Sequence, residues 1–350
     1  MELVFDGHND VLLRLLVNMQ GGGDPVAEFR DGTDQGHIDG PRARAGGLAG
    51  GMCAIYVSSG RFELRRPDAD GHYDTPMEPP LERQPSLDIA LAMAAIAFQL
   101  DRAGAWRLCR STAEIRDAME EGIFAAVLHM EGCEAIDRDL AALEVFHAAG
   151  LRSLGPVWSR NNIFGHGVPF TFPSSPDTGA GLTDAGFDLV RACNRLGIMI
   201  DLSHITEKGF WDVARTTDQP LVATHSNAHA LTPVARNLTD RQMDAIRESR
   251  GVVGLNYATT MLRPDGRESA GTPLFDMVRH IDYMVERMGI DCVALGSDFD
   301  GAMIPATIAD AAGNQNLVSA LSAAGYDADS LRKICRRNWL RVLGKAWHEH

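Results

Sequence analysis

The chain lacks the features of a protein that binds polyanions or membranes. Its 33 lysines and arginines are outnumbered by 47 aspartates and glutamates, the net charge is −14, and no dense basic block occurs. This balance argues against nucleic acid and against an anionic membrane surface as partners. No apolar run is long enough to span a bilayer, and the chain does not open on a basic segment followed by an apolar one. The sequence therefore predicts a soluble protein that is not exported and does not bind membranes.

Closely spaced cysteines are also lacking. The six cysteines are scattered without a Cys-x-x-Cys pair, so the spacing of a cysteine-based structural zinc site is absent. Several of them lie within apolar runs, where a thiol behaves as a small core residue. We therefore expect free cysteines and a reducing, cytoplasmic location. Cys133 is expected to pack in the core rather than to act as a nucleophile.

Short apolar segments alternate with longer segments of helical periodicity. Near-continuously apolar strands that alternate with helices indicate a parallel sheet covered by helices, and eight repeats predict a closed (β/α)₈ TIM-type barrel. We expect a single domain, residues 1–350. The predicted strands are 3–5, 51–57, 124–130, 151–157, 198–202, 221–224, 252–256 and 292–296. The clearest predicted helices are 87–106, 140–148, 182–196, 209–216, 239–249 and 274–288.

Two long segments interrupt this alternation. Residues 61–85 follow the second predicted strand and residues 164–181 follow the fourth, and both are rich in proline and glycine. Both should leave the barrel at the end where such enzymes build their sites. They are either lids over a site or solvated loops without a role.

Metal-binding side chains recur where the predicted strands end. In such barrels the catalytic residues lie at the carboxyl ends of the strands. The first strand runs into Asp6-Gly7-His8-Asn9-Asp10, where His8 and Asp10 share one face of an extended backbone. Reading the other strand ends in the same way adds four residues. The complete set is His8, Asp10, Glu131, His204, His225 and Asp298.

This set predicts a metal centre. Taken singly, each histidine would more often be a hydrogen-bonded core residue and each carboxylate an ion-pair partner. Burying all six together without a cation would cost several kcal/mol of desolvation. Nitrogen and oxygen donors suit zinc, and the set exceeds what one tetrahedral ion needs. We therefore expect two zinc ions about 3.5 Å apart, bridged by Glu131.

Six ordered motifs carry a resemblance to a known family. They are Asp6-Gly7-His8-Asn9-Asp10, Met130-Glu131-Gly132, Asp201-Leu202-Ser203-His204, Ala223-Thr224-His225-Ser226 with Arg236-Asn237, Gly296-Ser297-Asp298-Phe299-Asp300-Gly301, and Asn338-Trp339-Leu340-Arg341-Val342. Along nearly its whole length the chain resembles the renal (membrane) dipeptidase family of binuclear zinc hydrolases. The resemblance is to the bacterial-like form without signal sequence or lipid anchor.

The resemblance implies a zinc-dependent dipeptidase and gives each residue a role. It assigns Asp298 as the proton-handling carboxylate and Arg236 as the clamp for the free carboxylate of a dipeptide. Without the family, Arg236 reads as a surface arginine near the start of a helix. Two zinc ions would lower the pKa of a bridging water enough to yield hydroxide for attack on the amide carbonyl. The implied ligands are His8 and Asp10 for one zinc, His204 and His225 for the other, and Glu131 for both.

Of two departures from the family pattern, at Trp158 and at Arg336-Arg337, the first concerns the site. Relatives carry a histidine after the fourth strand that is thought to help polarise the carbonyl, whereas this chain has Trp158 there. Either Arg160, Asn161 or His166 supplies a donor from the same loop, or Trp158 marks a narrower or altered substrate range. At the first strand, Asp6 is expected to orient the His8 imidazole from behind.

Three functions are consistent with these residues. The first is the dipeptidase. The second is an amidohydrolase-like enzyme that acts on another small amide, a lactone or an acylated amino acid, which the missing histidine keeps open. The third is a non-catalytic barrel that retains metal and binds a small ligand or partner, against which the intact Asp298 and ligand set argue. Relatives often form dimers, so a homodimer is among the expected states.

Overall fold

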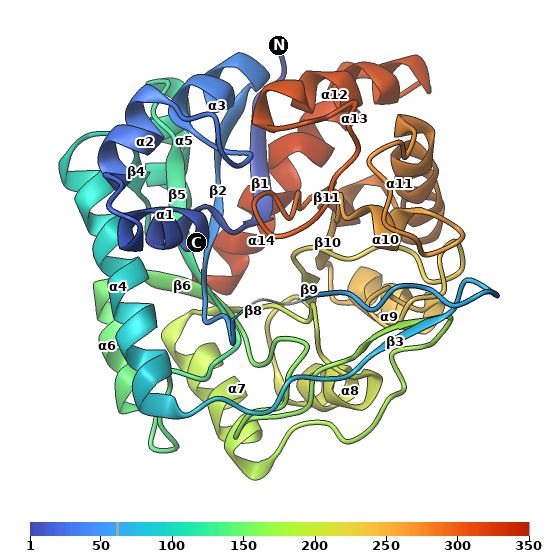
Figure 1. Cartoon of the computed structure of the whole chain (residues 1–350), viewed down its shortest axis with the longest axis horizontal. Helices are drawn as coiled ribbons and strands as arrows, with labels where there is room; N and C mark the ends of the chain where they lie inside the picture. Colours follow the sequence, from blue (N-terminus) through green and yellow to red (C-terminus); the bar gives the residue numbers. More distant parts are fainter. Residues whose placement is uncertain (61–62, 350) are drawn as a thin grey trace.

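Eight parallel strands surround a common centre in the computed structural model, which describes residues 1–60 and 63–349. Two hydrogen-bonded sheets, β1-β2-β5-β6-β8 and β9-β10-β11, are joined by the bridges Asp201–Val222 and Asn9–Phe299. The ring therefore closes as a (β/α)₈ barrel, and all eight predicted strands are confirmed (Figure 1). The strands are β1 (Val4–Asn9), β2 (Leu48–Tyr56), β5 (Ala125–Glu131), β6 (Leu151–Gly155), β8 (Met199–Ile200), β9 (Val222–Ala223), β10 (Val252–Leu255) and β11 (Val293–Leu295).

Helices cover the outside of the barrel. The predicted helices correspond to α4 (Arg83–Arg102), α6 (Ala141–Ala149), α7 (Asp184–Leu196), α8 (Glu207–Thr216), α9 (Asp240–Glu248) and α11 (Leu274–Met288). Local signals set their ends: Thr239 and Gln242 form a capping box before α9, and Gly197 ends α7 with a φ of 69°.

The remaining helices occupy the connections and the C-terminal region. Within the described residues, no helix combines the length and the apolar character that a bilayer span requires. The remaining helices are α1 (Val11–Gln20), α2 (Pro25–Asp31), α3 (Gly40–Gly46), α5 (Thr112–Glu120), α10 (Thr259–Leu262), α12 (Asn314–Ala323), α13 (Ala328–Arg332) and α14 (Asn338–Ala346), with short turns η1 (Ile290–Cys292), η2 (Ala311–Gly313) and η3 (Lys333–Arg337).

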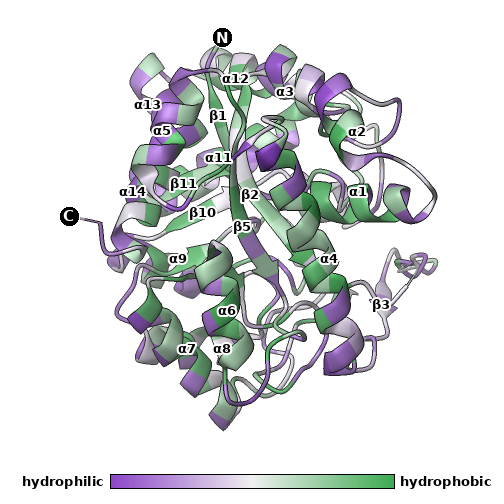
Figure 2. Ribbon diagram, turned by 90° about the vertical axis from the view of Figure 1, so that its left-hand side faces the viewer, coloured by the Kyte–Doolittle hydropathy of each residue, from purple (hydrophilic) through white to green (hydrophobic). Residues whose placement is uncertain are grey.

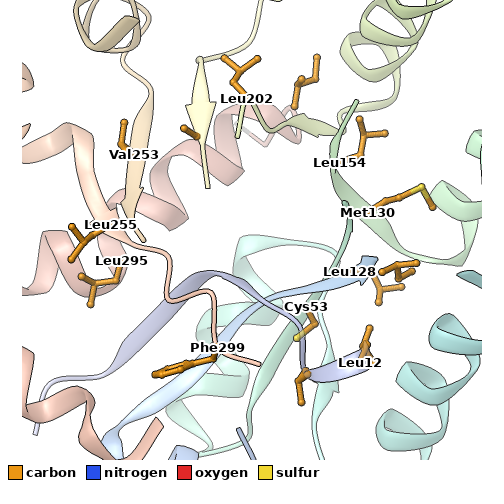
Figure 3. Close-up of a cluster of buried hydrophobic side chains, with 14 of the residues drawn as sticks. Leu12, Cys53, Leu128, Met130, Leu154, Leu202, Val253, Leu255, Leu295 and Phe299 are labelled. Atoms are coloured by element: carbon orange, nitrogen blue, oxygen red, sulfur yellow. The ribbon is translucent and has the colours of Figure 1, made fainter. Parts of the chain in front are cut away.

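Alternate strand residues point outward and pack against the helices. Figure 2 shows the central strands in hydrophobic colours and the helices with mixed faces. Figure 3 shows part of this outer layer, with Leu128 and Met130 from β5 and Leu255 from β10 among the labelled side chains. The six cysteines are all buried and free, and the Cys133 thiol donates to the carbonyl of Gly155, consistent with a packing role.

The inner face of the barrel begins as an apolar layer. Trp339 of α14 plugs this end, and its indole N–H donates to the Leu295 carbonyl at 2.9 Å. Seven strands each contribute one buried residue against it: Phe5, Met52, Val127, Met199, Val222, Val252 and Ala294. This layer separates the site described below from solvent at the opposite end.

Glycines form the next layer. A Cβ atom at Gly7, Gly254 or Gly296 would lie within 2.5 Å of the Thr224 carbonyl oxygen, and one at Gly7 would also clash with the Trp339 ring. No larger residue fits at these three positions. The close approach lets the polar strand ends that follow converge.

The two long excursions meet in a small ribbon. Strand β3 (Tyr73–Thr75) pairs antiparallel with β7 (Phe170–Phe172), and we call these two strands the β3–β7 ribbon. The Tyr73 ring stacks on Phe172, and Thr171 donates its hydroxyl to Asp74 at 2.7 Å. In the first excursion, residues 61 and 62 lie outside the described part of the chain. The two excursions therefore support one another.

One further short strand, β4 (Arg107–Leu108), pairs in parallel with β5.

Candidate metal centre

The predicted ligands converge around one carboxylate oxygen. Glu131, the last residue of β5, places Oε1 at 3.6 Å from His8 Nε2, 3.1 Å from His204 Nε2 and 3.4 Å from His225 Nε2. His8 Nε2 also lies 3.5 Å from Asp10 Oδ2. All five side chains are buried, so the ends of β1, β5, β8 and β9 form one cluster without bulk water.

Within this cluster the donor atoms fall into overlapping groups whose members lie within 4.8 Å of one another. Two of the groups share Glu131, and a third joins Asp298 to two of the histidines. Among the described residues, neither ring nitrogen of His8 nor Asp10 Oδ1 has a hydrogen-bond partner. Buried polar atoms of this kind are costly unless a cation binds them. The groups are His8 with Asp10 and Glu131, Glu131 with His204 and His225, and His8 with His225 and Asp298.

The hydrogen bonds of His204 define its tautomer. Arg236 donates from Nη2 to His204 Nε2 at 3.0 Å, and because a guanidinium only donates, Nε2 carries the lone pair. The proton is then on Nδ1, which lies 2.8 Å from the Ser159 hydroxyl. The unprotonated nitrogen therefore faces Glu131, and a metal ion that binds it would replace the hydrogen bond from Arg236.

The hydrogen bonds of His225 define the same tautomer. The Thr224 hydroxyl donates to Asp201 Oδ2 at 2.7 Å and can therefore accept from His225 Nδ1, also at 2.7 Å. Nε2 of His225 then carries a lone pair 3.0 Å from the lone pair of His204 Nε2. Two facing lone pairs repel, so this arrangement fits a cation between or beside them.

The pKa shifts of the clustered side chains also favour a bound cation. Burial raises the pKa of Glu131 well above its usual value and lowers the pKa values of His204 and His225 well below theirs. Burial also opposes a charge on His8, but the carboxylates of Glu131 and Asp10 outweigh it and raise its pKa to about 10. The surroundings of His8 Nε2 thus strongly favour a positive charge, whether proton or metal ion.

Asp298 lies beside the cluster in a strained loop after β11. Its φ is 58°, a left-handed conformation that is uncommon for a residue other than glycine. Its backbone N–H donates to the His8 carbonyl at 3.0 Å, and its Oδ2 accepts from Asn256 at 2.9 Å. Burial raises the pKa of its carboxyl group, which suits a group that accepts a proton during a reaction.

The expected role of Asp6 is wrong. Its carboxylate makes no hydrogen bond to the His8 ring but accepts from the backbone N–H and the hydroxyl of Ser297, both at 2.7 Å, and from Asn9 at 3.1 Å. The β1 register shifts between Asp6 and Asn9, so the simple alternation of faces does not hold there. Asp6 instead braces the loop that carries Asp298.

Arg236 is not a surface residue. It is 5% exposed and contacts His204 Nε2, the His225 carbonyl at 3.2 Å and the Ser226 hydroxyl at 3.4 Å. Burial lowers its pKa to about 10, so it remains charged at neutral pH. The burial of Arg236 cannot be predicted from its position in the sequence, because the connection between β9 and α9 folds back over the cluster.

The loop after β6 places Trp158, but none of the proposed replacement donors, at the cavity. Trp158 lines a cavity of about 800 Å³ together with Glu131, His204, Arg236 and Asp298. Arg160, Asn161 and His166 do not line it, so the expectation of a donor among them is wrong. Their polar atoms bond elsewhere: Arg160 to Glu134 at 3.0 Å, Asn161 to the Gly167 N–H at 3.2 Å and His166 to the Gly181 carbonyl at 2.9 Å.

Other cavity residues escaped the sequence reading. Tyr56 is the last residue of β2, a strand end at which the same rule would have found it. Phe170, on the β3–β7 ribbon, has no such signal because only the pairing of two distant segments brings it to the cavity.

A barrel whose strand ends gather histidines and carboxylates into buried donor groups defines a metal-dependent hydrolase. The family model for membrane dipeptidase (peptidase family M19) matches residues 2–349, and the chain belongs to this family.

Solved structures and curated relatives agree with this assignment. A metallo peptidase from Rhodobacter sphaeroides, crystallised with a phosphinate mimic of the dipeptide L-Ala-D-Ala, is 51% identical with a TM-score of 0.94, and the match covers 99% of each chain. An uncharacterised protein of the pqqA 5′ region of Klebsiella pneumoniae is 51% identical over 265 residues, 75% of this chain and 98% of the relative. The dipeptidase tcpJ of Claviceps purpurea is 27% identical over 344 residues, 97% of this chain and 76% of the relative.

Proposed function

We propose that this protein is a dipeptidase with two zinc ions that cleaves the amide bond of short peptides bearing a free C-terminal carboxylate. The observation that carries the proposal is the sharing of Glu131 by two donor groups, with Arg236 buried beside them. The family membership and the dipeptide mimic bound to the Rhodobacter sphaeroides neighbour support the substrate class.

Two of the donor groups supply the ligands that we propose. His8 and Asp10 would hold one ion, His204 and His225 the other, and Glu131 both. When bound, such a pair supplies a Lewis acid for the carbonyl oxygen and lowers the pKa of a water molecule. The hydrogen bonds that His204 and His225 donate from Nδ1 to the Ser159 and Thr224 hydroxyls hold the two rings with Nε2 toward the ions.

The other residues handle the proton and the substrate. Asp298, with a raised pKa and a fixed orientation from Asn256, would take a proton at a carboxylate oxygen and return it to the leaving amine. Arg236 would pair its guanidinium with the free carboxylate, which limits the enzyme to short substrates. Burial by the loops around the cavity strengthens both interactions by excluding water.

A second enzyme function keeps one observation in its favour. Trp158 occupies the place of the family histidine, and Arg160, Asn161 and His166 of the same loop do not line the cavity. An amidohydrolase that acts on another small amide, a lactone or an acylated amino acid would need that donor less. A non-catalytic barrel is disfavoured, because Asp298 is held in a strained conformation beside the donors.

Metal analysis tests the binuclear centre directly. Protein purified without chelator should contain two zinc ions per chain, and less than about one would contradict the proposal. Glu131→Ala should lower the affinity for both ions, whereas His225→Ala should weaken one. His147→Ala, on the partly exposed face of α6, is the matched control and should leave the metal content unchanged.

A substrate screen tests the reaction. A library of L,L and L,D dipeptides incubated with zinc-reconstituted protein should yield free amino acids, and removal of metal with a chelator should stop the release until zinc is restored. If only acylated amino acids, lactones or other amides are hydrolysed, the second function replaces the first.

A further inference from the structure

Three aromatic rings line one part of the cavity. Tyr56 ends β2, Trp158 follows β6, and Phe170 lies on the β3–β7 ribbon. The ring centroids of Tyr56 and Trp158 are 5.2 Å apart, and those of Trp158 and Phe170 are 5.5 Å apart. We call these three residues the aromatic wall. Apolar faces at a site of polar chemistry suggest recognition of an apolar group.

The wall is held from behind. The Arg160 guanidinium lies 5.5 Å from the Trp158 ring centroid, and Arg160 is fully buried. It donates to Glu134 at 3.0 Å and 3.1 Å and to the carbonyl of Val57, next to Tyr56, at 2.9 Å. One arginine thus ties together the loops after β2, β5 and β6. The wall is therefore formed before any substrate binds, which lowers the ordering cost of binding.

The wall and Arg236 flank the same histidine. The His204 ring centroid is 5.7 Å from Trp158 and 6.2 Å from Phe170, and its Nε2 accepts from Arg236. The carboxylate and the side chain of a C-terminal residue are attached to the same carbon atom. A carboxylate held by Arg236 therefore brings that side chain toward the aromatic wall.

The acidic side of the cavity belongs to other strands. Asp10, Asp298 and Asp300 line the cavity from the ends of β1 and β11, whereas Trp158, His204 and Arg236 follow β6, β8 and β9; Glu63 and Glu268, which also line it, are exposed. Carboxylates suit the ammonium group of the N-terminal residue. This charge distribution orients a dipeptide with its C-terminal residue toward the wall.

We propose that the aromatic wall is the subsite for the side chain of the C-terminal residue and selects dipeptides whose C-terminal side chain is apolar. The inference rests on the proposed dipeptidase function. A C-terminal aspartate or glutamate side chain would lose water against the wall without gaining a buried cation. Arg66 also lines the cavity but is exposed, where an ion pair contributes little.

A dipeptide panel tests the subsite. The zinc-reconstituted full chain is assayed with Ala-Xaa, in which Xaa is glycine or the L or D form of leucine, phenylalanine or aspartate. For at least one C-terminal stereochemistry, kcat/KM for leucine or phenylalanine should exceed that for glycine and for aspartate by about tenfold or more. A second series, Xaa-Ala, should show no comparable apolar preference.

Variants link the preference to the wall. Phe170→Ala, at a half-buried ribbon position, and Trp158→Ala should each lower kcat/KM about tenfold more for the apolar C-terminal residues than for the glycine substrate. General structural damage would lower kcat/KM for all substrates alike. The ratio of kcat/KM between the apolar and glycine substrates is therefore the informative quantity. Phe275→Ala, an aromatic on α11 that is 68% exposed and does not line the cavity, is the control.

The outcomes separate the two proposals. Turnover with no C-terminal preference, a preference for aspartate, or an apolar preference in the Xaa-Ala series would overturn the subsite and leave the dipeptidase function standing. No turnover of any dipeptide by protein that has bound zinc would overturn the dipeptidase function and the subsite together.

Discussion

The two ends of the same barrel differ in what their inward-facing residues do. Along β5 the buried inner residues run from Ala125 and Val127 at one end to His129 and Glu131 at the other. The chain through β11 follows the same order, from Ala294 in the strand to Gly296 and Asp298 in the loop after it. The strands are continuous, yet their first halves bury apolar groups and their last residues bury charges.

This difference separates stability from chemistry. Around Trp339 the apolar layer contributes hydrophobic burial and tight packing. Around Glu131 the same burial is unfavourable for the charged groups and shifts their pKa values. Hydrophobic burial at the apolar end therefore offsets the desolvation free energy of the charged groups at the polar end. Substitutions at the apolar end should change stability, and substitutions at the polar end should change activity.

The largest effect is expected for Asp298→Asn at the polar end. It should lower kcat about 10²- to 10⁴-fold, because the proton carrier is lost, while zinc content and thermal stability stay close to those of the unaltered protein. Steady-state kinetics with metal analysis measure this. Asp188→Asn, at a carboxylate paired with Arg138 on the surface, is the control. Survival of activity in Asp298→Asn would remove it from the proton-carrying role.

At the apolar end, Trp339→Ala should produce the converse result. Loss of this fully buried ring should lower the free energy of unfolding by about 3–5 kcal/mol and leave kcat of the folded fraction unchanged. Denaturant unfolding and active-site titration together measure both quantities. Trp211→Ala, at a partly buried tryptophan beside Arg241, should cost less. A lowered kcat in fully folded Trp339→Ala would show that the two ends are coupled.

Arg236→Ala tests whether the polar end recognises a carboxylate. KM for free dipeptides should rise roughly tenfold to a hundredfold, because charge-assisted hydrogen bonds are lost. KM for an amidated dipeptide, which lacks the carboxylate charge, should not change. An unchanged KM for the free dipeptide would exclude Arg236 from the substrate site.

The smallest effect is expected for Trp158→His, which places the residue of the family pattern in the loop after β6. An imidazole donor should speed the hydrolysis of dipeptides with small C-terminal residues by a few fold, roughly 1 kcal/mol or less. Rates for C-terminal glycine and leucine, compared with Trp158→Phe as control, measure it. Equal rates would mean that this position does not contact the scissile carbonyl.

Much of the barrel could be predicted because its signals are local. The eight strands are short apolar runs, and the ligand candidates stand directly after them, so a rule about strand ends finds them without contacts. Tyr56 obeys the same rule, but tyrosine is not among the usual zinc ligands, so a rule for zinc ligands does not include it. Trp158 was noticed through its departure from the family pattern.

Other features depend on contacts between distant segments. The β3–β7 ribbon joins residues about a hundred positions apart, and neither segment shows a strong strand pattern of its own. The partner of Asp6 is Ser297, across the closure of the ring, and a register shift in β1 decides this. Arg160 is a candidate donor to the site by sequence, yet in the fold it is fully buried, pairs with Glu134 and lies outside the cavity.

The sequence by itself determined the family, the barrel and which side chains could bind metal, because strand periodicity and the order of the motifs are written along the chain. Only the tertiary structure decided which nitrogen of each histidine faces Glu131, what Asp6 supports, and that an aromatic wall flanks Arg236. These depend on distances between the ends of different strands, and such distances exist only once the ring has closed.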